Sequence, residues 1–177
     1  TGKYNRSIDD CDTAIRLNDQ DSFAYAVRGA ANFCLNEFEV AIRDTSRAIR
    51  IQNDSPLAYA IRGASRTERG QLDAAMNDLS RAIDLDSTDA FSWSWRSRVK
   101  YERNDFAGAM EDSRKALTID SENVISHYYL GNSLQATQDI AGAIESLSRY
   151  LELVEDDTIL LTRARLLHQS GDASLAV

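Results

Sequence analysis

Small and apolar residues recur at steps of three and four along most of the chain, which is the spacing of one face of an α-helix. In the segment after Ser55 these residues are Leu57, Ala60, Ile61 and Ala64. In the segment after Gly70 they are Leu72, Ala75, Met76, Leu79, Ala82 and Ile83. We therefore predict two amphipathic helices that are separated by a short turn.

The same pattern returns every 34 residues. The pentapeptide YAVRG at residues 25–29 is followed by YAIRG at residues 59–63. Small residues recur in register at Gly29, Gly63, Ser97 and Gly131, and again at Ala41, Ala75, Ala109 and Ala143. Larger residues also recur in register, and one such position holds Tyr25, Tyr59 and Trp93. A fixed period of this length indicates an array of helical hairpins.

The segments between the predicted helices carry residues that end and begin helices. The residues between the two helices of successive units are Asn36, Gly70, Asn104 and Gln138, and Gly2 and Gly171 hold this position near the chain ends. Gly and Asn favour the left-handed conformation that closes a helix. The first helices are preceded by good N-cap residues, which are Asp21, Ser55, Asp89 and Asn123. Pro56 then fits the first position of a helix.

The stretch YAIRGASRTERGQLDAAMNDLSRAIDLDS at residues 59–87 resembles the tetratricopeptide repeat (TPR). This 34-residue unit pairs a large aromatic and a glycine in its first helix with two small residues around a bulky one in its second. The resemblance covers nearly the whole chain and implies an all-α fold, a right-handed superhelical solenoid of antiparallel helix pairs. The chain departs from the family most in the fourth unit, where His127 takes the aromatic position and Tyr150 replaces an alanine.

We expect residues 1–177 to form a single array. Four complete repeats are predicted at residues 22–55, 56–89, 90–123 and 124–156. Residues 2–21 are expected to be a partial repeat with only a second helix, and residues 157–177 a partial repeat or a capping helix. Because both ends fall inside a repeat, we expect the chain to be part of a longer array or a larger protein.

The composition is that of a folded, acidic protein, with 43% hydrophobic residues, 27% charged residues and a net charge of -8. An acidic surface disfavours nucleic acids and anionic membranes. No apolar run approaches the ~20 residues of a membrane-spanning helix. Cys11 and Cys34 lack the spacing of a zinc site or a disulfide framework. We therefore expect no nucleic-acid partner, no membrane insertion and a cytoplasmic location.

An arginine recurs in the first helices on a face that is expected to look toward the second helix. Arg28, Arg62 and Arg96 share this position, and Asp44, Asp78 and Asp112 share one position of the second helices. Both residues change together in the fourth repeat, to Leu130 and Ser146. We therefore predict one structural Arg–Asp pair in each of the first three repeats, because a half-buried guanidinium is tolerated beside a carboxylate. A row of anion-binding arginines is the less favoured alternative.

No group of residues indicates catalysis or a bound cofactor. His127 stands in an aromatic packing position, and His168 has no cysteine or carboxylate at ligand spacing. The sequence contains no phosphate-binding glycine loop and no Ser/His/Asp arrangement. We expect no enzyme, no cofactor and no metal site.

In TPR arrays the first helices line the concave face, so the resemblance implies a binding groove there. The predicted groove residues are Phe23, Ala26, Ala30, Phe33, Leu57, Ala60, Ala64, Phe91, Trp95, Arg98, Tyr101, Tyr128 and Asn132. Trp95, Tyr101 and Tyr128 are the candidate anchors, since aromatic residues dominate interface hot spots. In the alternative interpretation, Phe91 and Trp95 fill space between neighbouring hairpins.

Two functions are compatible with this pattern. The favoured one is a non-catalytic scaffold that binds an extended or helical peptide segment of a partner protein in the groove. The alternative is a structural spacer that self-associates through the ends of the array. The Lys, Asn and Arg clamp by which chaperone-binding family members hold a terminal carboxylate is missing, so we expect an apolar or mixed segment.

Overall fold

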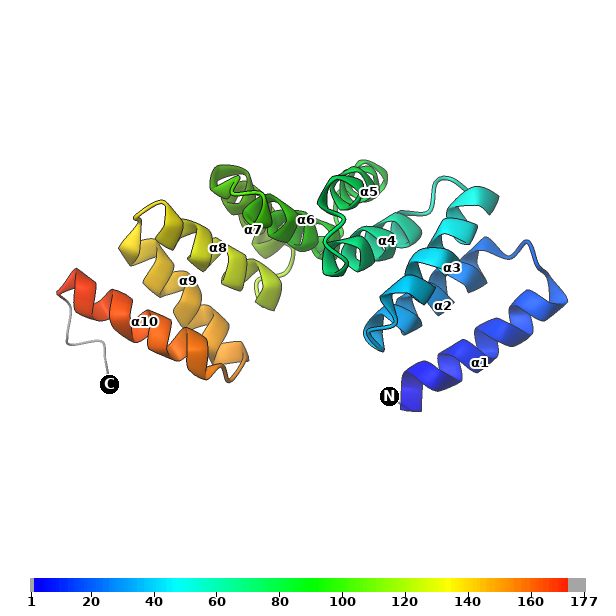
Figure 1. The fold of residues 1–177 in the computed structure, drawn as a ribbon, viewed down its shortest axis with the longest axis horizontal. Coiled ribbons are helices and arrows are strands. Elements are labelled where there is room, and N and C mark those ends of the chain that lie inside the picture. Colours follow the sequence, from blue (N-terminus) through cyan, green and yellow to red (C-terminus); the bar gives the residue numbers. More distant parts are fainter. Residues whose placement is uncertain (1, 172–177) are drawn as a thin grey trace. The chain divides into compact units, whose positions relative to one another are not determined.

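The protein is described over residues 2–171 by a computed structural model, and these residues form ten α-helices and no strand (Figure 1). The helices are α1 (Gly2–Leu17), α2 (Ser22–Cys34), α3 (Phe38–Ile51), α4 (Pro56–Glu68), α5 (Leu72–Leu85), α6 (Ala90–Glu102), α7 (Phe106–Ile119), α8 (Val124–Ala136), α9 (Ile140–Leu153) and α10 (Asp157–Ser170). The starts of helices α2, α4, α6 and α8 are spaced 34 residues apart. The predicted all-α array of helix pairs is therefore confirmed.

The chain divides into two compact units inside α6, the first ending at Trp95 and the second beginning at Arg96. In the first unit α1 packs on α2, α2 on α3, α3 on α4 and α4 on α5, and the two first helices α2 and α4 also touch. In the second unit α7 packs on α8, α8 on α9 and α9 on α10. Each predicted complete repeat contains two helices, while the extent of a single array over residues 1–177 stays a prediction.

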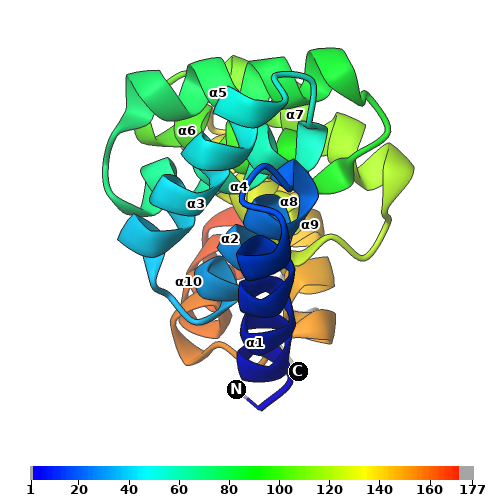
Figure 2. The same cartoon turned by 90° about the vertical axis from the view of Figure 1, so that its right-hand side faces the viewer.

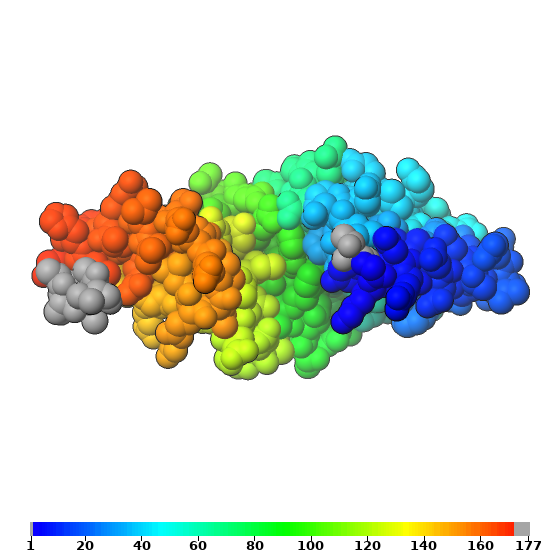
Figure 3. Space-filling model, turned by 90° about the horizontal axis from the view of Figure 1, so that it is seen from below, coloured from blue at the N-terminus to red at the C-terminus, as the bar shows by residue number. Residues whose placement is uncertain are grey.

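Within the first unit, helix α1 packs against α2 alone. Figure 2 shows α1 in front of α2, and Figure 3 shows the outer side of α1 open on the surface. Cys11 is the buried residue of α1, and Leu17 at its end is 85% exposed.

A glycine of the first helix permits a close helix crossing in three hairpins. A Cβ atom on Gly63 would lie 2.6 Å from Cγ of Leu79 in α5. Gly29 and Gly131 are equally close to the residues that correspond to Leu79 in α3 and α9. The recurring small residues of these three hairpins therefore lie where the two paired helices cross most closely.

In the third hairpin two serines replace the glycine and its bulky neighbour. Ser97 Oγ donates to the carbonyl of Ala109 at 2.9 Å and lies 2.6 Å from Ser113 Oγ. The larger side chain on α6 is thus matched by a smaller one on α7, and both hydroxyls are satisfied where they are buried.

The predicted helix ends also appear in the structure. All four N-cap side chains accept a hydrogen bond from the backbone amide three residues later, as Asp21 does from Ala24 N at 3.0 Å. The residues between paired helices are left-handed, with φ from 61° to 69° at Asn36, Gly70, Asn104 and Gln138. Gly171 closes α10 with φ 75°. Gly2 is an exception, because it is the first residue of α1 rather than a closing residue.

Candidate functional site

The three predicted Arg–Asp pairs are present, and each arginine donates hydrogen bonds to both carboxylate oxygens of its aspartate. The pairs and the distances from Nε and Nη2 are Arg28–Asp44 (2.8 and 2.7 Å), Arg62–Asp78 (2.8 and 2.8 Å) and Arg96–Asp112 (2.8 and 3.0 Å). The aspartates are buried and the arginines half-buried. The pKa of Arg28 is raised, mainly by its hydrogen bonds to Asp44.

Each buried carboxylate also has a second donor, which lies four residues after the arginine on the same helix. These donors and their distances to the aspartate Oδ2 are Asn32 Nδ2 (3.5 Å), Arg66 Nη1 (2.7 Å) and Lys100 Nζ (2.9 Å). They were not predicted, although they share one position of the 34-residue period. Their shared position could have indicated the second donor, but an asparagine, an arginine and a lysine do not form a recognisable pattern in the sequence.

The first two arginines also reach the second helix of the preceding repeat. Arg28 Nη1 donates to Asp12 Oδ1 at 2.5 Å, and Arg62 Nη1 donates to Ser46 Oγ at 3.3 Å. Each of these guanidinium groups therefore connects three helices. Its donors are used inside the fold, which favours the structural interpretation over an anion-binding row.

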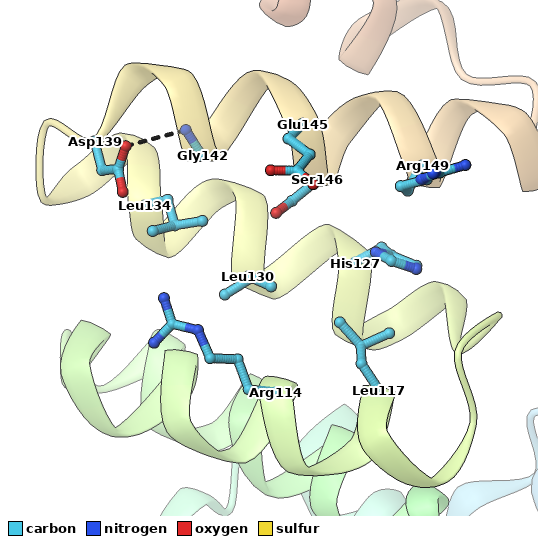
Figure 4. A pocket seen from close by; sticks show the side chains of 10 residues that line it. All are labelled: Arg114, Leu117, His127, Leu130, Leu134, Asp139, Gly142, Glu145, Ser146 and Arg149. Atoms are coloured by element: carbon cyan, nitrogen blue, oxygen red, sulfur yellow. Dashed lines mark hydrogen bonds between the residues drawn. The ribbon is translucent and has the colours of Figure 1, made fainter.

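The four positions of this polar network are filled differently in the fourth repeat. They hold Arg114, Leu130, Leu134 and Ser146, and all four line a cavity of about 380 Å³ between α7, α8 and α9 (Figure 4). The cavity lies where the other repeats place their ion pair. It was not predicted, because the joint change to Leu130 and Ser146 indicated only that a pair was missing.

The predicted groove residues of α2 and α4 differ widely in exposure. Phe23 and Leu57 are 71% and 38% exposed, and Ala30 is half-buried. In contrast, Ala26 and Ala64 are buried, at 1% and 0% exposure. Ala26 packs against alanines of α3 and α4. The prediction that these two alanines line an open groove is corrected, because their small size lets neighbouring helices approach and cover them.

The predicted anchor Trp95 belongs to a packed aromatic cluster with Phe33 and Phe91. Its ring centroid lies 5.5 Å from that of Phe33 and 5.8 Å from that of Phe91. Trp95 is 5% exposed, so it offers almost no surface to a ligand. The alternative interpretation, in which Trp95 fills space between helices, is the one that the structure supports.

Three predicted groove residues of the first unit meet at one cavity of about 480 Å³. Leu57, Ala60 and Phe91 contribute to its wall, although Ala60 is buried at 2% exposure and adds little open surface. The other lining residues are Pro56, Ile61, Asp86, Thr88 and Asp89. This surface is apolar on the side of α4 and acidic on the loop that precedes α6.

In the second unit, Tyr101 lies in an aromatic cluster. Its ring centroid is 5.6 Å from that of Phe106 and 5.4 Å from that of Tyr129. Burial raises the pKa of Tyr101 above the ordinary value. Arg98, on the same helix, is paired with Glu102, with Nε 2.8 Å from Oε1.

Tyr128 is half-buried between two other tyrosines. Its ring centroid lies 5.0 Å from that of Tyr129 and 5.5 Å from that of Tyr150. The Tyr150 hydroxyl donates to Asp156 Oδ2 at 3.1 Å, and Asp156 also caps α10. Tyr150, which replaces an alanine of the earlier repeats, therefore joins the end of α9 to the start of α10.

The predicted residues Tyr101 and Asn132 meet at a second cavity, of about 510 Å³. Asn132 Nδ2 donates to the Tyr128 carbonyl at 2.8 Å, which fixes the amide against α8. The remaining lining residues are Gln135, Ala136, Gln138, Ile140, Thr162, Leu166 and Gln169.

Helix α10 supplies three of these lining residues, and none of them was predicted. Thr162, Leu166 and Gln169 are spaced by four and three residues, so they share one helix face. That spacing was the available signal, but the prediction of a partial repeat or capping helix at residues 157–177 assigned no binding role to it.

Within residues 2–171, no helix is long and apolar enough to cross a membrane. The same part of the chain contains no cluster of three or more His, Cys, Asp or Glu side chains that could hold a metal ion.

Solved structures of helical repeat proteins share this fold at low sequence identity. PilF of Pseudomonas aeruginosa matches with a TM-score of 0.85 and 15% identity, over 99% of this chain and 80% of that one. YrrB, a TPR protein with an unusual peptide-binding site, matches with a TM-score of 0.73 and 14% identity, over 94% of this chain and 87% of that one. Human IFIT1, solved as a dimer with m7Gppp-AAAA, matches with a TM-score of 0.74 and 15% identity, over 99% of this chain and 45% of that one.

No family model matches the sequence, and no significant match was found among curated proteins. The structural likeness shows that the chain has the helical repeat fold of TPR proteins, in agreement with the resemblance of residues 59–87. Proteins with this fold hold different ligands, so the function of this chain depends on its own surfaces.

Proposed function

We propose that the chain is a non-catalytic interaction scaffold, and that α8 and α10 hold an extended segment of a partner protein between them. The observation that carries this proposal is the cavity of about 510 Å³ at Tyr101, Asn132 and Gln169. Volumes of this size are typical of binding sites. The fold, which is shared with the TPR protein YrrB and its peptide-binding site, supports the same class of function.

The chemistry of this cavity suits a peptide backbone. Its amide and hydroxyl side chains, on Asn132, Gln135, Gln138, Thr162 and Gln169, can both donate and accept hydrogen bonds. An extended peptide presents N–H and C=O groups in alternation and needs both kinds of partner. Ile140 and Leu166 add apolar contact for side chains of the guest.

The charge of the protein restricts the partner. A net charge of -8 disfavours an acidic segment or a nucleic acid, and the exposed Phe23 and Leu57 offer apolar contact in the first unit. We therefore expect a neutral or basic segment with apolar side chains.

The test is a selection of short random peptides on phage against the full chain. Enriched peptides should bind in solution and lose affinity by about tenfold or more when Asn132 and Gln169 are both changed to alanine, because each removes a hydrogen-bonding partner. Asn77→Ala is the matched control, since Asn77 is an exposed amide on α5. Equal loss in the control, or undiminished binding to the double variant, would contradict this site.

Self-association is the second candidate function. It is favoured by exposed apolar residues on the two outermost described helices, with Leu17 at 85% on α1 and Leu160 and Leu161 at 50% and 59% on α10. Sedimentation over a range of concentrations distinguishes the two functions. A concentration-dependent oligomer that Leu161→Glu disrupts would support the spacer, whereas a monomer at all concentrations would exclude it.

A further inference from the structure

The cavity of the fourth repeat holds two polar groups whose hydrogen-bonding capacity is unused. In residues 2–171, neither the Arg114 guanidinium nor the Ser146 hydroxyl makes a hydrogen bond or ion pair. Ser146 is 7% exposed, and Figure 4 shows its oxygen directed into the cavity from α9. Arg114 extends from α7 toward α8, below Leu134 (Figure 4).

The other repeats act as internal references for this cavity. There the equivalent space is filled by an arginine and an aspartate, and the position of Arg114 holds Asp12 or Ser46, which accept from the arginine. In the fourth repeat the acceptor position has become a cation, and the ion pair has become Leu130 and Ser146. The site therefore lacks an anion opposite Arg114 and the bulk of a long side chain.

Two of the other charged groups at the rim, Arg149 and Asp139, are already engaged. Arg149 Nη1 lies 2.9 Å from Glu152 Oε2, and Glu145 further raises the pKa of Arg149. Asp139 caps α9 by accepting from Gly142 N at 3.0 Å, the dashed bond in Figure 4. Arg114 is thus the one lining cation without a partner in the described structure.

We propose that this cavity binds a monocarboxylate with a short, branched apolar body. The carboxylate pairs with Arg114 and accepts from Ser146 Oγ, and the apolar body rests on Leu117, Leu130 and Leu134. A phosphate fits less well, because a dianion would meet one unpaired cation and the carboxylates of Asp139 and Glu145. The site is separate from the peptide surface at α10 and does not depend on it.

This chemistry has two sources, which are a free branched acid and the C-terminal leucine of a protein. The probes are 4-methylpentanoate and a hexapeptide with a C-terminal leucine, each beside its neutral amide. Binding is followed by the NMR shifts of Ser146 and of the methyl groups of Leu130 and Leu134 in the full chain. A ligand of this size is expected to bind with a Kd on the order of 1 mM.

Either acid should bind saturably, and its amide at least about tenfold more weakly. Binding of only the hexapeptide would identify a protein C terminus as the source, and binding of the free acid would identify a small molecule. No saturable shift with either probe up to roughly 50 mM, a concentration well above the expected Kd, would overturn the proposal. Equal binding of acid and amide, or tighter binding of inorganic phosphate, would also overturn it.

Variants test the two polar groups separately. Arg114→Gln should weaken binding by about tenfold or more, and Ser146→Ala by a smaller factor. Arg81→Gln removes an exposed arginine from α5 and should leave binding unchanged. The double change Leu130→Arg with Ser146→Asp rebuilds the ion pair of the other repeats and should abolish binding. Unchanged binding to Arg114→Gln would overturn the proposal even if the double variant does not fold.

Discussion

The polar network predicts that equivalent arginines in the first and second repeats contribute unequally to stability. Arg28→Met and Arg62→Met each remove a guanidinium but keep much of the apolar stem. After the first change, the buried Asp44 keeps only Asn32 Nδ2 at 3.5 Å. After the second change, Asp78 keeps the Arg66 guanidinium at 2.7 Å. The two variants therefore differ in whether a buried charge is left without a counter-charge.

The expected magnitudes follow from this difference. An orphaned buried charge costs roughly 3–5 kcal/mol, so Arg28→Met should lower the free energy of unfolding by about 3 kcal/mol. Arg62→Met loses charge-assisted hydrogen bonds without orphaning Asp78, so about 1–1.5 kcal/mol is expected. The loss at Asp12 adds little, because its side chain is 47% exposed.

Urea unfolding followed by circular dichroism at equal protein concentration measures both values. A double-mutant cycle with Asp44→Asn adds a second check, since the double variant should recover about 2 kcal/mol relative to the sum of the single changes. Equal losses for Arg28→Met and Arg62→Met would refute the role of the second donor. Additive effects of Arg28→Met and Asp44→Asn would refute the orphaned charge.

Two further predictions concern packing and pH. Gly63→Ala should cost about 1–3 kcal/mol in urea unfolding, because the new Cβ would lie 2.6 Å from Leu79 Cγ, whereas Gly2→Ala, with nothing within 4 Å, should be neutral; equal effects would contradict the close crossing. Burial raises the pKa of both Tyr101 and Tyr150, so the folded state holds these protons more tightly than the unfolded chain. Their contribution to stability is complete below the ordinary pKa of 10.0 and declines as the pH rises above it. Replacing both tyrosines by phenylalanine should therefore make the urea midpoint of unfolding depend less on pH between about pH 9 and about pH 11. An unchanged pH dependence of the midpoint would contradict this.

Helix ends and crossings could be predicted from the sequence because they depend on a few neighbouring residues. Asp21 caps α2 through an amide three residues away, and Gly70 closes α4 with its own backbone. The paired change to Ser97 and Ser113 also follows one rule, since the summed size of two facing residues must fit one crossing. Local chemistry and a fixed period were sufficient for these features.

The accessibility of the groove could not be predicted in the same way. A first helix touches its own second helix, the preceding second helix and the neighbouring first helix, as α2 and α4 do in this structure. The periodicity of one helix shows which side is apolar, but not how closely a neighbour covers it. The sequence therefore predicts the correct helices for Ala26 and Trp95, but the prediction that they are exposed is wrong, because neighbouring helices cover them.

The fourth repeat allows stability and binding to be tested separately, because it lacks the ion pair of the other repeats and is still not fully apolar at these positions. Leu130 and Ser146 stand in place of both the arginine and the aspartate, so neither charge is left without its partner, which explains why the two positions differ together. Stability alone would favour an apolar residue at position 146, where the serine instead leaves a cavity of about 380 Å³ beside Arg114. Ser146→Leu should therefore raise the free energy of unfolding by about 0.5–2 kcal/mol and abolish the binding of the branched acid. Asn77→Leu, an exposed change on α5, should affect neither property. A destabilised Ser146→Leu variant would show that the cavity is not free for a leucine side chain. A variant that still binds 4-methylpentanoate would show that the acid binds elsewhere.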